Sequence, residues 1–171
     1  MQPTCIHLYC GSGKGKTTAA LGQLLRTHGA GLPAQLFCFL KDGRSSEVAA
    51  LRQLGIPVCF APGSGRFFWQ MQPAEKQVFL QAQRTLFEQA AEAVRSGAAS
   101  VIALDEVLDA CSLGVCTLDE LRALLNARRC ELILTGREGR FLLPEADYYT
   151  EMTAVKHPYD RGLPARRGIE F

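Results

Sequence analysis

The sequence predicts an α/β fold in which a mainly parallel central sheet lies between two layers of helices. Two observations lead to this class. Short apolar runs alternate at least four times with helical patterns, which is typical of a parallel sheet covered on both faces. A glycine-rich turn also joins the first apolar run to the first helical pattern, as in loops that bind phosphate.

The composition fits one folded domain over residues 1–171, with 47% apolar and 21% charged residues. The net charge of +2 is too small to indicate nucleic-acid binding, and no apolar run approaches the length of a membrane span. The chain has seven cysteines, an odd number, and no C-x-x-C pair. Together with the lack of an export signal, this pattern favours reduced thiols in a cytoplasmic protein.

The strands are predicted from short apolar runs and the helices from apolar positions spaced by three and four residues. The predicted strands cover residues 5–10, 35–40, 56–60, 101–104, 130–134 and 148–155. The predicted helices cover residues 17–28, 47–54 and 74–96, a segment that ends near 127, and a short helix at 141–146. Thr117 and Glu120 form a plausible capping box for the helix that ends near residue 127. The remaining tail, residues 156–171, is expected to be an ordered loop.

The glycine-rich turn carries the residues of a phosphate-binding loop. Its backbone N–H groups and the following helix N-terminus would surround phosphate oxygens, Lys16 would reach the phosphates, and the Thr17 hydroxyl would ligate Mg2+. Cys10 stands where the usual pattern has its first glycine, so the loop that begins at Gly11 is one residue short. The alternative is a turn that only connects strand to helix. The candidate nucleotide-binding residues here are Gly11, Ser12, Gly13, Lys14, Gly15, Lys16, Thr17 and Thr18.

Polar residues follow three other predicted strands, at Lys41, at Asp105–Glu106 and at Thr135–Arg137. Parallel strands bind ligands at their carboxyl ends, so these groups should meet the phosphate loop at one edge. The acidic pair would hold Mg2+ or Mn2+, although two acids at a strand end can also be a solvated terminus or a helix cap. Arg137 would contact phosphate or pair with an acid. The sequence therefore predicts a magnesium-dependent, ATP-using enzyme with the three-layer P-loop NTPase (RecA-like) fold.

Three consecutive aromatic residues, Phe67, Phe68 and Trp69, lie in the glycine-rich segment 61–73 rather than in a periodic element. Large aromatic side chains on a loop suggest a wall for a flat ligand or a contact for a partner. The alternative is a small satellite core beneath the loop.

Several segments, taken in order, resemble the P-loop ATP:corrinoid adenosyltransferases of bacterial cobalamin biosynthesis. The phosphate loop is similar to that family's shortened loop, and the residues 65–69 are similar to its Gly-Phe-Thr-Trp segment. The tail is the most distinctive part. The matching blocks are Gly11–Ala20, Gly65–Trp69, Ala103–Glu106, Leu125–Arg128, Leu134–Arg137, Val155–Gly162 and Ala165–Phe171.

The resemblance implies that cobalt(I) of a reduced corrinoid attacks C5′ of ATP and that triphosphate leaves. Lys14 and Lys16 would then hold phosphates, while Thr17, Asp105 and Glu106 would serve Mg2+. Phe67 and Trp69 would stand beneath the corrin ring and displace its lower axial ligand. A reduced flavoprotein would supply the electron, and the enzyme would be a homodimer. Two alternatives remain from the residues alone: a P-loop kinase or ATPase that shares only the loop, and a nucleotide-binding regulatory subunit without turnover.

Overall fold

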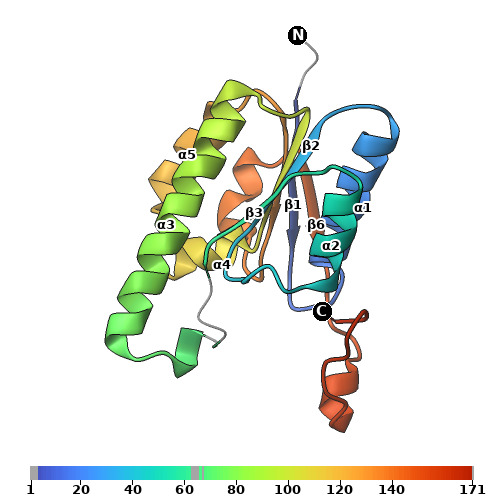
Figure 1. The fold of residues 1–171 in the computed structure, drawn as a ribbon, viewed down its shortest axis with the longest axis vertical. Helices are drawn as coiled ribbons and strands as arrows, with labels where there is room; N and C mark the ends of the chain where they lie inside the picture. Colours follow the sequence, from blue (N-terminus) through green and yellow to red (C-terminus); the bar gives the residue numbers. More distant parts are fainter. Residues whose placement is uncertain (1–3, 63–65, 67, 171) are drawn as a thin grey trace.

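The computed structural model describes residues 4–62, 66 and 68–170. Its strands form one sheet of six, in the order β3-β2-β4-β5-β1-β6, and every pairing is parallel (Figure 1). The sequence predicted a mainly parallel sheet, so the α/β class is confirmed and the sheet is parallel throughout. The strands are β1 Ile6–Cys10, β2 Ala34–Cys38, β3 Val58–Phe60, β4 Val101–Asp105, β5 Glu131–Thr135 and β6 Tyr148–Glu151.

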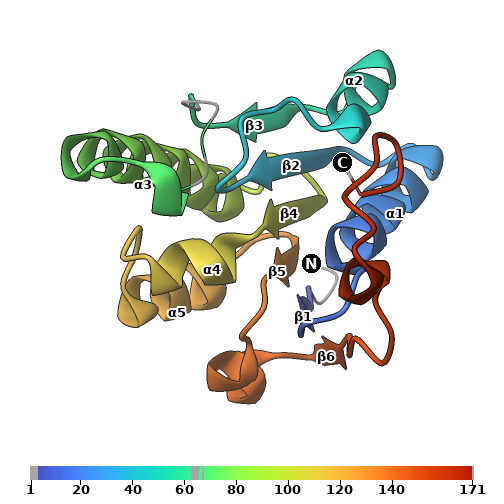
Figure 2. The same ribbon diagram turned by 90° about the horizontal axis from the view of Figure 1, so that it is seen from below.

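Helices cover both faces of the sheet, with α1 and α2 on one face and α3, α4 and α5 on the other (Figure 2). The α-helices are α1 Lys16–Gly29, α2 Ser46–Gln53, α3 Pro73–Ser96, α4 Val107–Ser112 and α5 Leu118–Asn126. Three short 3-10 helices complete the described structure: η1 Phe68–Gln70, η2 Arg140–Glu145 and η3 Pro158–Arg161. Within the described part of the chain, no helix is both long enough and apolar enough to span a membrane.

The apolar periodicity explains how these layers pack. On one face, Leu86 and Phe87 of α3 and Leu121 of α5 are buried against the sheet. On the other, Ala20 and Leu24 of α1 pack against strand residues from the opposite side of the pleat. All five residues of β4 are buried, which is what a central strand covered by two helical layers requires. The layers therefore hold the carboxyl ends of the strands in fixed relative positions.

The predicted capping box at the start of α5 is confirmed. The Glu120 N–H donates to Thr117 Oγ1 at 3.1 Å, and the Thr117 N–H donates to Glu120 Oε2 at 2.8 Å. The segment predicted as a helix at 141–146 is instead the 3-10 helix η2, which has Pro144 inside it. Helix α4 was not predicted, because its six residues are too few to show a period.

The last strand is shorter than the sequence predicted. β6 ends at Glu151 because the backbone of Met152 turns onto the glycine-rich loop. The Met152 N–H donates to the Cys10 carbonyl at 2.7 Å, and the Gly13 N–H donates to the Met152 carbonyl at 2.7 Å. Beyond this point the chain runs past the carboxyl edge of the sheet and includes η3 (Figure 1).

Candidate active site

The carboxyl ends of β1, β2, β4 and β5 bring the candidate polar residues to one edge of the sheet. Cys38 at the end of β2 pairs with Asp105 at the end of β4, and Tyr9 of β1 pairs with Thr135 at the end of β5. The phosphate loop extends from β1 at this edge, and Lys41 follows β2 there. The pairing of neighbouring strands thus assembles groups that are far apart in the sequence.

The phosphate loop has the backbone of an anion-binding turn. Gly11 and Gly15 have φ values of 106° and 121°, a region that residues with side chains rarely adopt. A Cβ on Gly13 would lie 2.8 Å from the Met152 carbonyl oxygen, and one on Gly11 would meet the same oxygen. Two of the loop glycines are therefore required by contact with the segment after β6. The first N–H groups of α1 have no partner within the helix and remain available to an anion.

The Lys16 side chain folds back onto the backbone of the glycine-rich loop. Its ammonium donates to the carbonyl of Gly11 at 2.7 Å and to that of Gly13 at 2.8 Å. Burial lowers the pKa of Lys16, and the nearby positive charge of Arg137 lowers it further. The two positive charges therefore repel each other, and an anion bound near both would relieve that repulsion.

Asp105 is the centre of a hydrogen-bonded cluster. Its side chain is fully buried. It accepts hydrogen bonds from Thr17 Oγ1 at 2.9 Å, from Thr135 Oγ1 at 2.7 Å and from the Lys41 ammonium at 2.6 Å. A buried carboxylate requires such compensation, since an unpaired one would be costly. The sequence placed Thr135 at this edge but gave it no role. Its position as a polar residue at the end of an apolar strand is the signal that could have indicated a role for Thr135.

Glu106, the second acid, lies between the sheet edge and solvent. Its backbone is left-handed, with φ of 59°, and its N–H donates to Thr135 Oγ1 at 2.8 Å. Its Oε1 lies 3.4 Å from the Lys41 ammonium. Burial raises the pKa of Glu106, and the charge of Lys41 opposes that shift. For Lys41, burial alone would lower the pKa, but the charges of Asp105 and Glu106 outweigh it and raise the pKa.

The oxygen atoms around the Lys41 ammonium are suited to a hard cation. Asp105 Oδ2, Thr17 Oγ1 and Glu106 Oε1 lie 2.6, 3.3 and 3.4 Å from the ammonium nitrogen. Among residues 4–62, 66 and 68–170, no group of three or more His, Cys, Asp or Glu side chains could hold a metal by itself. Mg2+ commonly takes one or two carboxylates and completes its shell with water and substrate phosphates. The donor set fits Mg2+ on those terms.

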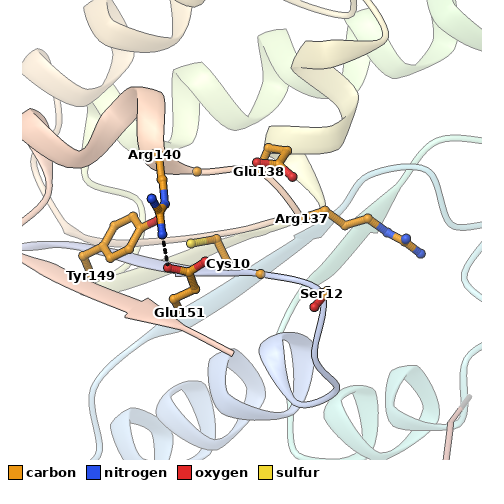
Figure 3. Close-up of a pocket in the computed structure, with 9 residues that line it drawn as sticks. Cys10, Ser12, Arg137, Glu138, Arg140, Tyr149 and Glu151 are labelled. Carbon is orange, nitrogen blue, oxygen red and sulfur yellow. Dashed lines mark hydrogen bonds and ion pairs between the residues drawn. The ribbon is translucent and has the colours of Figure 1, made fainter. Parts of the chain in front are cut away.

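Arg137 is tied to the site through its backbone. Its N–H donates to Asp109 Oδ2 of α4 at 3.0 Å, and its carbonyl accepts the Gly11 N–H at 2.8 Å. Sequence reasoning missed Asp109, which lies in the helix that was not predicted. In Figure 3 the Arg137 side chain points away from the group formed by Tyr149, Arg140 and Glu151.

A pocket of about 280 Å³ adjoins the phosphate loop on the β6 side. The Arg140 guanidinium and Glu151 form an ion pair of 3.1 Å on its wall (Figure 3). The residues that line it are Cys10, Gly11, Ser12, Arg137, Glu138, Gly139, Arg140, Tyr149 and Glu151. The candidate site therefore includes a concave surface next to the loop.

The aromatic segment lies at the same end of the molecule, where η1 precedes α3 (Figure 1). Phe67 lies outside the described residues. Phe68 is half-buried, with its ring centroid 5.8 Å from that of Phe79 and 5.3 Å from the Lys76 ammonium. Trp69 is 72% exposed. The satellite-core alternative thus describes Phe68, whereas Trp69 presents an aromatic surface to solvent.

Comparison with known proteins decides the family. Residues 2–171 match the family model described as ATP:corrinoid adenosyltransferase BtuR/CobO/CobP. The chain belongs to this family of ATP:corrinoid adenosyltransferases. The corrinoid adenosyltransferase of Escherichia coli K12 is 31% identical over 170 residues, which cover 97% of this chain and 85% of that protein. That of Pseudomonas aeruginosa is 29% identical over 170 residues, with 97% of this chain and 83% of that protein covered.

A third relative, the corrinoid adenosyltransferase of a Sinorhizobium species, is 31% identical over 174 residues. The alignment covers 97% of this chain and 79% of the relative. These matches run over 97% of this chain, so they do not depend on the phosphate loop alone. The resemblance noted from the sequence is confirmed, and the chain is placed among enzymes that transfer an alkyl group.

Proposed function

We propose that this enzyme transfers the 5′-deoxyadenosyl group of ATP to the cobalt(I) of a reduced corrinoid. The cobalt electron pair forms the cobalt–carbon bond at C5′, and the C5′–O bond breaks with its electron pair on the oxygen of the departing triphosphate. One observation carries the proposal: the family match spans residues 2–171, which include the glycine-rich loop with Lys16 at the start of α1.

The main task of this site is to neutralise a leaving group that carries several negative charges. On nucleotide binding, Lys16 would exchange the Gly11 and Gly13 carbonyls for phosphate oxygens. Lys14 in the same loop, Lys41 beside Thr17 and Arg137 bonded to Gly11 would contact the rest of the triphosphate. Charge that is already in place when the bond breaks stabilises the transition state without reorganisation.

Thr17, Asp105 and Glu106 are the residues that would hold Mg2+ or Mn2+. When bound, the ion supplies further positive charge to the triphosphate. Thr135 would keep Asp105 oriented for this role, since its hydroxyl donates to the carboxylate. The proposed reaction needs no general base, because reduced cobalt is itself the nucleophile.

We also propose that Trp69, together with Phe67 two residues before it in the sequence, lies against the corrin ring and excludes the lower axial ligand of cobalt. The high exposure of Trp69, in η1 at the same end of the molecule as the site, supports this role, because an exposed indole offers a large apolar face to a planar ligand. We expect a reduced flavoprotein as electron donor, a homodimeric assembly and a cytoplasmic location, as the family resemblance implies.

The product of the reaction tests the proposal. The enzyme is incubated with ATP, Mg2+ and chemically reduced cobalamin, and the products are separated. Adenosylcobalamin with intact triphosphate is the expected result. ADP with phosphate would instead indicate a kinase or an ATPase, and unchanged bound ATP would indicate a regulatory subunit.

Lys16→Ala should abolish turnover and leave the protein folded, because it removes the charge nearest the leaving group. Arg95→Ala, which removes an exposed cation at the far end of α3, is the matched control and should retain activity. Near-normal turnover of Lys16→Ala would contradict the phosphate role.

Trp69→Ala separates corrin positioning from packing. The variant should lose far more activity when the reaction starts from cobalt(II) and a protein reductant than when it starts from cobalt(I). Val78→Ala removes an equally exposed apolar side chain, 72% accessible on α3, and should show neither loss. Equal losses of the Trp69 variant in both assays would show that the indole only packs.

A further inference from the structure

The turn that carries Lys41 has an unfavourable backbone. Among the described residues other than glycine, only Leu40 and Glu106 have positive φ values, 58° and 59°. A leucine pays a steric penalty in this left-handed region and stays there only where its surroundings hold it. Leu40 directly precedes Lys41, and Glu106 is one of the two acids that face its ammonium. The strain is therefore concentrated where two strand ends present opposite charges to each other.

Two hydrogen bonds hold the turn in place. The Phe39 N–H donates to the Asp105 carbonyl at 2.9 Å, which fixes the turn to β4. The Leu40 N–H donates to Gln83 Oε1 at 3.0 Å. Gln83 belongs to α3, a helix on the sheet face opposite α1, so the second bond fixes the turn to the helical layer.

Gln83 is an unusual residue for its position. Its side chain is fully buried, although its neighbours on this face of α3 are Phe79, Leu86 and Phe87. Its Nε2 has no hydrogen-bond partner among the described residues. A buried amide with an unsatisfied N–H costs stability, and an apolar side chain of similar volume would avoid that cost. The hydrogen bond that Gln83 accepts from the Leu40 N–H is an interaction that an apolar side chain could not make.

We infer that Gln83 is a positioning residue: by accepting the Leu40 N–H it holds the left-handed turn that delivers the Lys41 ammonium to Thr17, Asp105 and Glu106. The inference rests on the proposed function, in which that ammonium contacts the nucleotide. Gln83 itself touches none of these groups. Its effect on nucleotide binding passes entirely through the position of Lys41.

The test is a double-mutant cycle between Gln83→Leu and Lys41→Met, read by ATP affinity without corrinoid. We expect Gln83→Leu to raise the dissociation constant for ATP about fivefold, a loss expected for one misplaced contact. In the Lys41→Met background, Gln83→Leu should cause no further loss. Gln81→Leu makes the same chemical change at an exposed position of α3 and should leave ATP affinity unchanged.

Stability gives a readout that separates positioning from a structural role. Gln83→Leu replaces one unsatisfied group, the amide nitrogen, with another, the Leu40 N–H, so the urea midpoint of unfolding should stay close to that of the parent. A residue that only supported the fold would lower the midpoint and the ATP affinity together. A lowered midpoint together with a lowered ATP affinity would overturn the inference. So would an unchanged ATP affinity, or a loss of affinity from Gln83→Leu that is as large in the Lys41→Met background as in the parent.

A crystal structure of the Gln83→Leu protein provides a measurement that needs no nucleotide. Leu40 should leave the left-handed region, and the Lys41 nitrogen should move out of hydrogen-bond distance of Asp105. An unchanged turn would also overturn the inference. These readouts do not involve adenosyl transfer, so a failure of the proposed reaction would appear in the product assay and not here.

Discussion

Replacing Thr135 by valine tests how the acidic cluster is held together. The two side chains have nearly the same shape, so the change removes a hydroxyl and leaves the packing in place. That hydroxyl is buried, donates to Asp105 Oδ1 at 2.7 Å and accepts the Glu106 N–H at 2.8 Å. The variant therefore loses a hydrogen bond to a charged group and leaves a backbone N–H without a partner.

The size of the effect follows from these two bonds. A hydrogen bond to a charged group contributes about 1.5–3 kcal/mol, and an unsatisfied buried donor costs about 1–3 kcal/mol. Because both losses come from one hydroxyl they overlap, and we expect Thr135→Val to reduce the free energy of unfolding by about 3 kcal/mol. For a protein of this size that corresponds to a fall in Tm of roughly 6–12 °C. Turnover should fall as well, because Asp105 loses an orienting partner.

Urea unfolding and calorimetry measure the first effect, and the product assay measures the second. Thr85→Val is the matched control, since its hydroxyl is exposed and bonds only to the Gln81 carbonyl of its own helix, at 3.2 Å. The control should change the free energy of unfolding by less than about 0.5 kcal/mol. If Thr135→Val behaved like this control in both assays, the hydroxyl would not be what orients Asp105.

Two further changes test other parts of the structure. Gly13→Ala would put a Cβ 2.8 Å from the Met152 carbonyl oxygen and should weaken ATP binding at least tenfold in a direct titration. Gly22→Ala is the control, because nothing lies within 4 Å of a Cβ at that position of α1, and its effect on stability should be neutral or favourable. Equal ATP affinities of the two variants would show that the loop tolerates the side chain. The Arg84 guanidinium holds the pKa of Glu120 at about 2, so the ion pair should stabilise the fold above the unfolded pKa of about 4.3 and lose that effect as the pH falls toward 2. The difference in urea midpoint between the parent and Glu120→Gln should accordingly shrink between pH 7 and pH 2.5, and a constant difference would contradict the assignment.

The sequence predicted the features that have local signals. Alternating strands and helices, the glycine-rich loop and the acidic pair after β4 are all visible in short windows, and parallel topology then places them at one edge. The Thr117 capping box was equally readable, because both of its partners lie within one turn of helix.

The features that the sequence did not predict depend on contacts between distant segments. Met152 continues an apparent strand pattern, yet its backbone is diverted by hydrogen bonds to Cys10 and Gly13. Gln83 looks like any polar residue within an amphipathic helix, and no spacing rule indicates that it faces the Leu40 turn. Such pairings become visible only when the layers are in place.

The place of β1 in the sheet has a consequence for biosynthesis. Both of its neighbours in the sheet, β5 and β6, follow β2, β3 and β4 in the sequence. A growing polypeptide must therefore carry β1 as an unpaired apolar segment until β5 and β6 have been synthesised, since neither hydrogen-bonding edge of β1 can be satisfied sooner. The glycine-rich loop that follows β1 takes its final shape only after Met152 has been synthesised, because the Met152 carbonyl accepts the Gly13 N–H.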